Sequence, residues 1–320
     1  MEKHIEIRRV SDGQQMMKTV TVFTPTYNRA YTLPKLYNSL CRQTSGDFMW
    51  LIVDDGSTDN TGELIKGWQE ENKVLIEYHK QSNGGKMRAH NLGVKLCNSE
   101  LFFCVDSDDY IPDVAIEHII DFWNEHTDRN NIAGIIGYRY VLDNENDNNP
   151  KILSRFGVDY PVTDQELTNR GFKGDNAKIF RTDIIRQYPF PEIEGEKFIS
   201  EVSAFDRIWQ DYKMFLMDEA VTTSLYLPDG YSKNFRYILM SNPKGTALVC
   251  NQSLKFWGHE MSLVTKLRRL TKYITMSRLA GNNDIYRDST VKMPLYPLCY
   301  IISLFLTPYY RCELKSIEKI

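Results

Sequence analysis

Two groups of aspartates in this chain stand directly after short apolar runs. The segment 54–57 reads Asp-Asp-Gly-Ser, and the segment 106–109 reads Asp-Ser-Asp-Asp. If the preceding runs are parallel strands, both groups lie at the carboxyl edge of one sheet, where ligands of such sheets bind. Neighbouring carboxylates repel one another unless hydrogen bonds or a cation offset their charge. Mg²⁺ or Mn²⁺ would suit this edge, because hard cations bind carboxylate oxygens and leave positions for water and phosphate. The alternative is two ordinary turns, since both tetrapeptides consist of turn-forming residues.

Strands and helices that could position these aspartates alternate through the first half of the chain. Four runs rich in β-branched and aromatic residues predict strands: 20–24, 49–53, 74–78 and 101–105. Four segments with helical spacing of apolar residues predict helices: 32–40, 61–71, 86–96 and the stretch after Pro112. Strands that are apolar on both faces, separated by amphipathic helices, indicate an α/β fold. We therefore expect a mostly parallel sheet with helices on both faces.

The second half of the chain is less regular. Short strands are predicted near 177–180 and 221–227, and the Asn/Asp-rich segment 143–149 predicts an exposed loop. From about residue 241 the pattern becomes helical. We therefore predict an N-terminal tail over 1–16, a main domain over 17–240 and a C-terminal helical region over 241–320.

Composition excludes several classes of protein. The 320 residues carry a net charge of −3, which excludes a chain-wide basic nucleic-acid binder. Apolar residues make up 42%, which excludes a wholly disordered chain. The six cysteines form no CxxC pair, so they resemble reduced thiols of a cytoplasmic protein rather than a disulfide framework or zinc site. The first 15 residues lack the apolar core of a secretory signal.

The C-terminal quarter is both basic and apolar. Residues 251–320 contain eleven Lys or Arg against five Asp or Glu, and 293–310 contain no charge. Prolines interrupt that uncharged run and leave ten proline-free residues, which cover about half of a roughly 30 Å hydrocarbon layer. A membrane span is therefore not expected. The pattern favours a helical cap on the main domain, with peripheral contact of 251–320 to the inner face of the cell membrane as the alternative.

Four motifs occur in a fixed order between residues 24 and 109. They are Thr24-Pro25-Thr26-Tyr27-Asn28-Arg29, the segment 53–59, Asn83-Gly84-Gly85-Lys86 with Asn91 to Gly93, and Asp106-Ser107-Asp108-Asp109. This order resembles the family-2 glycosyltransferases, which are inverting, nucleotide-sugar-dependent enzymes of GT-A (Rossmann-like) fold. The resemblance covers about 20–110 closely and extends loosely to about 240. It implies a nucleotide-sugar half over 17–110 and an acceptor half over 111–240.

The resemblance assigns donor-binding roles. Residues 24–29 would hold the nucleobase and ribose, with Asn91 and Ser107 also at the donor. Asp55 would contact the base, and because uracil offers an imide N–H to a carboxylate, a UDP-sugar is favoured. Lys86 follows a glycine pair at a predicted helix start, where an ammonium and the helix dipole favour a diphosphate or a sugar hydroxyl.

The resemblance also implies a metal and a base. Asp108, with Asp106, would bind Mn²⁺ or Mg²⁺, while Asp109 would be a further ligand or a helix cap. The family's base comes from an acidic motif that starts a helix, often Glu-Asp. Here Ser200-Glu201 stands at that place, which departs from the usual pattern. We therefore predict Glu201 as the base, with Asp206, Glu196 and Glu194 as alternatives.

Aromatic residues of the second half could stack against an acceptor sugar. The candidates are Trp209, Tyr226 and Tyr231, and His259 could approach the metal from the C-terminal region. The sequence thus predicts a metal-dependent glycosyltransferase that moves a sugar to a hydroxyl of a glycan or lipid-linked glycan in surface polysaccharide synthesis. The alternatives are a nucleotidyltransferase of related fold, or a catalytically silent nucleotide-sugar-binding scaffold protein.

Overall fold

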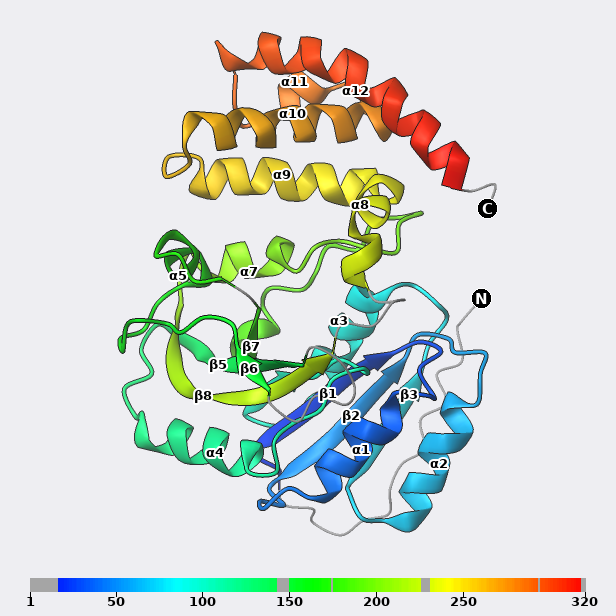
Figure 1. The fold of residues 1–320 in the computed structure, drawn as a ribbon, viewed down its shortest axis with the longest axis vertical. Coiled ribbons are helices and arrows are strands. Elements are labelled where there is room, and N and C mark those ends of the chain that lie inside the picture. Colours follow the sequence, from blue (N-terminus) through cyan, green and yellow to red (C-terminus); the bar gives the residue numbers. More distant parts are fainter. Residues whose placement is uncertain (1–16, 143–149, 174, 226–230, 293, 318–320) are drawn as a thin grey trace. The chain divides into compact units, whose positions relative to one another are not determined.

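A computed structural model of the chain describes residues 17–142, 150–173, 175–225, 231–292 and 294–317 (Figure 1). The chain divides into two compact units. The first comprises residues up to Pro189 together with Asp211–Leu227, and the second comprises Phe190–Gln210 and Pro228–Ile320. The predicted tail 1–16 and the predicted loop 143–149 lie outside the described residues.

An eight-stranded sheet forms the centre of the first unit (Figure 1). Its strands are β1 (Val20–Thr26), β2 (Phe48–Asp54), β3 (Ile76–Lys80), β4 (Leu101–Cys104), β5 (Ile132–Leu142), β6 (Lys151–Ile152), β7 (Asn176–Arg181) and β8 (Lys213–Leu225). The order is β3-β2-β1-β4-β7-β5-β6, and β8 also pairs with β5. The strands β3, β2, β1 and β4 are all parallel, whereas β7 is antiparallel to both β4 and β5. The expected mostly parallel sheet is confirmed.

Helices cover both faces of this sheet. They are α1 (Leu33–Cys41), α2 (Thr61–Glu71), α3 (Lys86–Leu96) and α4 (Ala115–Glu125), and the unit also contains the short helices α5 (Asp164–Asn169) and α6 (Thr182–Ile185). Alternate residues of β1 point to opposite faces. Val20 and Val22 join a buried cluster with α1, α2 and α4, while Phe23 packs its ring 5.5 Å from that of His90 on α3. The sheet is thus buried on both sides, as the two-faced apolar strands predict.

The strand β5 is absent from the sequence prediction, and β8 is longer than the predicted 221–227. Two glycines within β5, Gly134 and Gly137, weaken its strand signal. Both are required by packing. Gly134 has φ +150°, and a Cβ there would lie 2.0 Å from the Ile179 carbonyl oxygen, while a Cβ at Gly137 would lie 2.9 Å from Val221 Cγ2.

The second unit is helical among its described residues. Its helices are α7 (Val202–Ile208), α8 (Tyr231–Ser241), α9 (Pro243–Trp257), α10 (Leu263–Leu279), α11 (Ile285–Asp288) and α12 (Leu295–Ile317). Side chains of α8 to α12 share one buried cluster, which includes Met240, Leu254, Ile274, Ile285 and Cys299. The chain is therefore helical from Tyr231, ten residues before the predicted start. No helix in the described part of the chain combines the length and apolar content needed to cross a membrane.

Close packing of α3 on β1 generates the first prediction. A Cβ at Gly93 would lie 2.2 Å from Phe23 Cε2, and both residues are buried in the middle of their elements. We expect Gly93→Ala to lower the free energy of unfolding by about 1–3 kcal/mol, because the ring and the helix must move apart. Urea denaturation followed by tryptophan fluorescence measures this change.

Gly67→Ala is the matched control. Gly67 is also helical, on α2, but a Cβ there meets nothing within 4 Å. We expect this substitution to stabilise by about 0.5–1 kcal/mol, because alanine is the better helix former. Equal effects of the two substitutions would contradict the proposed packing constraint.

Candidate functional site

The carboxyl ends of β1, β2 and β4 meet where the strand order reverses. The chain runs from β1 outward to β2 and β3, and then returns to β4 on the other side of β1. Such a reversal leaves an opening between the loops on either side, which is where open α/β sheets bind ligands. The predicted nucleotide-sugar residues lie at or after the ends of these strands, except Lys86 and Asn91, which lie on α3. The sheet topology therefore brings the sequence motifs to one edge.

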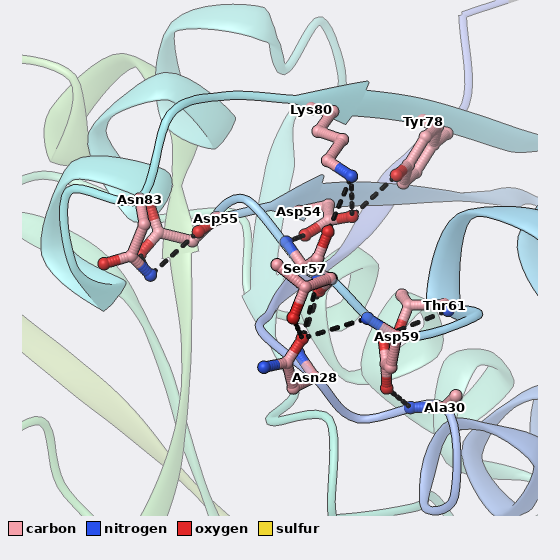
Figure 2. Close-up of polar contacts among 11 residues, drawn as sticks. Asn28, Ala30, Asp54, Asp55, Ser57, Asp59, Thr61, Tyr78, Lys80 and Asn83 are labelled. Atoms are coloured by element: carbon pink, nitrogen blue, oxygen red, sulfur yellow. Dashed lines mark hydrogen bonds and ion pairs between the residues drawn. The ribbon is translucent and has the colours of Figure 1, made fainter.

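The loops after β1 and β2 are tied together (Figure 2). Asn28, at φ 52°, accepts a hydrogen bond from the Thr58 N–H at 2.8 Å through Oδ1. Its own N–H donates to Ser57 Oγ at 2.8 Å. The Ala30 N–H donates to Asp59 Oδ2 at 3.2 Å. Asparagine tolerates the left-handed conformation that this reciprocal pairing requires.

The two adjacent aspartates after β2 have separate structural roles. Asp54 is fully buried and accepts hydrogen bonds from the Ser57 N–H at 2.7 Å and the Tyr78 hydroxyl at 2.7 Å (Figure 2). Lys80 Nζ lies 3.9 Å from Asp54 Oδ2 and donates to the Ser57 carbonyl at 2.7 Å. Burial, together with the bond to Asp54, raises the pKa of the Tyr78 hydroxyl. Asp54 is therefore part of the turn that follows β2.

Asp55 organises the loop that precedes α3. Its Oδ1 accepts from Gln81 Nε2 at 2.7 Å and the Gly84 N–H at 2.8 Å. Its Oδ2 accepts from the Gly85 N–H at 2.7 Å. It also accepts from Asn83 Nδ2 at 3.3 Å (Figure 2). The side chain is almost fully buried. Four donors, two of them backbone groups, thus offset its charge within the protein.

Lys86 links the two acidic groups. It is the first residue of α3 and directly follows Gly85, whose N–H Asp55 holds. Lys86 Nζ lies 2.8 Å and 3.0 Å from the two carboxylate oxygens of Asp106. Burial opposes ionisation of Asp106, but the Lys86 ammonium, with Arg139, outweighs it and holds the pKa of Asp106 below its ordinary value. The start of α3 therefore joins the end of β2 to the end of β4.

The turn 106–109 is held at both ends. The Val105 N–H donates to the Phe23 carbonyl of β1 at 2.9 Å, and Tyr110 forms an antiparallel bridge with Thr223 of β8. Asp109 is buried and accepts from Arg139 Nη1 at 2.9 Å, which also donates to Ser224 Oγ. Burial nevertheless raises the pKa of Asp109 to about 7, against the effect of Arg139. Asp109 thus connects the turn to β5 through its ion pair with Arg139.

Asp108 is less buried than Asp109, but the pKa of its carboxyl is raised as well. It is half-buried, and burial followed by repulsion from Asp106 raises the pKa of the Asp108 carboxyl above its ordinary value. A dication beside this carboxylate would relieve both effects. Among the described residues, no three or more His, Cys, Asp or Glu side chains gather at one point. An ion here would therefore take one or two protein carboxylates and complete its shell with phosphate and water oxygens, as Mg²⁺ and Mn²⁺ do.

The remaining predicted donor residues fall into buried and accessible groups. Thr24 is fully buried, and its hydroxyl accepts from Trp50 Nε1 at 2.9 Å, so its side chain belongs to the core. Pro25, Thr26 and Ser107 are also buried. Tyr27 is 47% exposed, and Asn28, Arg29 and Asn91 are half-buried. The side chains that a ligand could reach therefore begin after the end of β1.

The four candidate bases all lie in the second unit. Glu196 is buried and accepts from the Lys244 N–H at 2.7 Å and the Gly245 N–H at 2.8 Å, so it caps the start of α9. Asp206 is buried on α7, where Ser253 Oγ of α9 donates to it at 3.1 Å, and burial raises the pKa of this carboxyl. Glu194 and Glu201 are exposed, and Glu201 stands at the N-cap position of α7. Glu196 and Asp206 thus have structural roles in the packing of α9.

The predicted acceptor residues are also in the second unit or beyond the described residues. Trp209 is 6% exposed and packs near Phe205. Tyr231 begins α8, and Tyr226 lies outside the described part of the chain. His259 is exposed and lies 3.4 Å from Glu260, within the second unit.

Arg139 and Gln81 are the residues that sequence reasoning missed. Arg139 stands in a strand that was not predicted, and nothing near it in the sequence points to Asp109. Gln81 stands two residues before the Asn-Gly-Gly motif, so the predicted strand end near it was the available signal.

Comparison with known proteins identifies the family of this chain. A family model described as "Glycosyl transferase family 2" matches residues 21–188. The glycosyltransferase GlyG of Streptococcus pneumoniae serotype 4 is 29% identical over 158 residues, 48% of this chain and 50% of that protein. The poly(ribitol-phosphate) beta-N-acetylglucosaminyltransferase TarP of Staphylococcus aureus is 32% identical over 145 residues, 44% of this chain and 42% of that protein. The matched part spans about half the length of these relatives.

Solved structures share the fold. Residues 1–349 of S. aureus TarS superimpose with a TM-score of 0.56 at 19% identity, covering 95% of this chain and 92% of that one. The mannosyltransferase PcManGT of Pyrobaculum calidifontis, solved with GDP-Man and Mn²⁺, gives a TM-score of 0.53 at 16% identity, covering 98% and 87%. These similarities confirm the expected GT-A fold.

The hydrogen bonds of Asp55 generate the second prediction. Asp55→Asn replaces one acceptor oxygen with a donor, which leaves a buried N–H of the loop without an acceptor. We expect the free energy of unfolding to fall by about 2–4 kcal/mol, since hydrogen bonds to a charged group are lost. Urea denaturation measures the loss, and hydrogen exchange at Gly84 and Gly85 should become faster.

Asp113→Asn is the control for this change. Asp113 pairs with Arg42 at 3.0 Å, but both side chains are about half exposed. We expect an effect within about 0.5 kcal/mol, as for other exposed pairs. An unchanged unfolding midpoint for Asp55→Asn would show that the loop does not depend on this carboxylate.

Proposed function

Because the chain belongs to glycosyl transferase family 2 and is a glycosyltransferase, we propose that it transfers a sugar from a nucleotide-sugar bound at the carboxyl edge of β1, β2 and β4. The observation that carries this proposal is the placement of Lys86 at the start of α3, between the Asp55 loop and Asp106. A helix N-terminus and an ammonium at one point favour a diphosphate. The two carboxylate groups beside them suit a metal-bound pyrophosphate rather than a bare anion.

We propose UDP as the nucleotide. Structures of S. aureus TarS have been determined with UDP and UDP-GlcNAc, and TarP, which matches this chain at 32% identity, is named as an N-acetylglucosaminyltransferase. Asp55 already has four donors. A uracil imide N–H would therefore replace the side-chain amide of Gln81 or Asn83, which can rotate away, while the Gly84 and Gly85 N–H groups stay bound. Tyr27, Asn28 and Arg29 supply accessible polar and aromatic groups for the base and ribose.

We assign the metal to Asp108, with Asp106 as second ligand, and expect Mn²⁺ or Mg²⁺. When bound, such an ion acts as a Lewis acid that offsets charge on the departing nucleoside diphosphate. Lys86 would share Asp106 with the ion or move to the diphosphate. The Lys86 ammonium lies within hydrogen-bond distance of Asp106, so Lys86 offsets the charge of this carboxylate.

We propose Glu201 as the base that removes the proton from the acceptor hydroxyl. Its exposure supports this role, whereas Glu196 and Asp206 are committed to the start of α9 and to Ser253. One base and a direct attack on the anomeric carbon correspond to inversion, without a covalent sugar–enzyme intermediate. The acceptor would be a glycan or lipid-linked glycan, and Tyr226 and Tyr231 remain the proposed aromatic contacts, since Trp209 is buried.

Donor binding is tested by thermal shift with nucleotide-sugars, with and without Mn²⁺. We expect a UDP-sugar to raise the unfolding midpoint of the wild type more strongly with Mn²⁺, because a ligand stabilises only the state that binds it. Asp108→Asn should lose the Mn²⁺-dependent part of this shift, while Asp113→Asn should keep it. A shift of equal size with and without Mn²⁺ in the wild type would remove the metal from the proposal.

The base is tested by comparing Glu201→Gln with Glu194→Gln. Both replace an exposed carboxylate of the same segment with an amide of equal size. We expect Glu201→Gln to retain the thermal shift by UDP-sugar and to release UDP about 10²–10⁴-fold more slowly. Glu194→Gln should turn over at nearly the wild-type rate. The reverse result would reassign the base to Glu194, and release of pyrophosphate instead of UDP would refute sugar transfer.

A further inference from the structure

The outer face of α12 is apolar over three turns. Leu298, Ile302, Phe305 and Tyr309 recur at steps of four, three and four residues, and are 53%, 42%, 74% and 55% exposed. Such spacing places them on one stripe of a helix. Ile301 and Leu304 widen this stripe, at 55% and 42% exposed. We call these six residues the α12 stripe.

The inner face of the same helix already has its partners. Tyr296, Cys299, Ser303 and Thr307 are buried, and Cys299 Sγ lies 3.6 Å from the Leu267 carbonyl of α10. Ser303 and Thr307 donate to carbonyls of α12 itself, at 2.6 Å and 2.8 Å. The inner face therefore combines these small polar residues with apolar ones such as Tyr296, and α12 is apolar on two sides. A row of large exposed apolar side chains on the outer side indicates that this face contacts something other than water.

Positive charges stand at both ends of the α12 stripe. Lys292 precedes the helix, and Arg311 and Lys315 follow the stripe within it, all three exposed. Arg278 of α10 lies over the ring of Tyr300 and donates to its hydroxyl at 3.0 Å. Glu313, the acidic residue of this helix among those described, pairs with Arg236 of α8 at 2.8 Å. The surroundings of the stripe are therefore basic.

This charge distribution favours an anionic lipid surface over a second copy of the chain as the partner of the α12 stripe. In a symmetric dimer the same stripe would face itself, and an antiparallel crossing would bring Lys292 of one copy towards Arg311 and Lys315 of the other. Like charges at both ends would oppose that packing. An anionic lipid surface matches both features, since apolar and aromatic side chains enter the headgroup boundary while Lys and Arg contact phosphates.

We propose that the α12 stripe lies in the plane of an anionic bilayer surface, where it holds the second unit on the membrane. The helix has 23 residues, which is about 35 Å of length along that plane. It does not cross the bilayer, in agreement with its interrupted apolar content. The inference is independent of the donor, metal and base assignments, because it rests on the second unit alone.

The test is co-sedimentation of the full chain with vesicles of phosphatidylcholine alone and of phosphatidylcholine with phosphatidylglycerol. We expect binding to the anionic vesicles only, weakened by high salt. Ile301→Gln with Phe305→Gln should lower the partition coefficient about tenfold or more. Arg311→Gln with Lys315→Gln should lower it by about fivefold for each charge removed.

Leu153→Gln is the matched control, because Leu153 is 55% exposed, as Ile301 is, but belongs to the first unit. It should bind vesicles as the wild type does. All variants should keep the wild-type unfolding midpoint, since each changed side chain is exposed. Equal binding by the wild type and the Ile301→Gln, Phe305→Gln variant would overturn the proposal. So would a dimer in light scattering that this variant dissociates, without vesicle binding, since the stripe would then be a subunit interface.

Discussion

The carboxyl edge of the sheet, where we propose that the nucleotide-sugar binds, depends on the carboxylate of Asp55, which binds the loop before α3. Asp55 accepts the N–H groups of Gly84 and Gly85, and Gly85 takes φ 99°, a conformation that favours glycine. That conformation starts α3 at Lys86. Because α3 also packs tightly on β1 through Gly93, the position of Lys86 relative to the sheet is set at two points. The Lys86–Asp106 pair then follows from backbone geometry rather than from a flexible surface lysine.

The aspartates at this edge repel one another, and different neighbouring groups offset the charge of each. Asp54 and Asp55 accept hydrogen bonds, Asp106 pairs with Lys86, and Asp109 pairs with Arg139 although burial still raises the pKa of its carboxyl. Asp108 keeps a raised pKa from burial and from Asp106. A dication is therefore not needed to hold the fold together. The proposed ion would act on Asp108, whose ionisation burial and Asp106 oppose, and this suits an ion that arrives with the substrate.

The second unit uses its acidic residues differently. Pro243 has no N–H, so the first free donors of α9 are those of Lys244 and Gly245, and Glu196 binds both. In exchange, Asn242 accepts the N–H groups of Lys197 and Phe198. This reciprocal pairing fixes the segment that leads to Glu201 against the helical core. The basic and apolar character of the C-terminal quarter is concentrated on α10 and α12, and on α12 it faces outward.

Local patterns were enough to predict the first four strands and helices, because strand and helix periods are properties of neighbouring residues. The bounds of α2 and α3 agree with the prediction, and the two acidic groups could be placed at one edge because parallel strands end together. Only the tertiary structure decided which donor meets each carboxylate. The partners of Asp55 lie 26 to 30 residues further along the chain. Arg139 lies 30 residues after Asp109, on β5, whose glycines weaken the sequence signal of a strand. It also decided that Ser303 and Thr307 face the core of the second unit while Phe305 faces outward, since a helix apolar on most sides carries no local signal of its buried face.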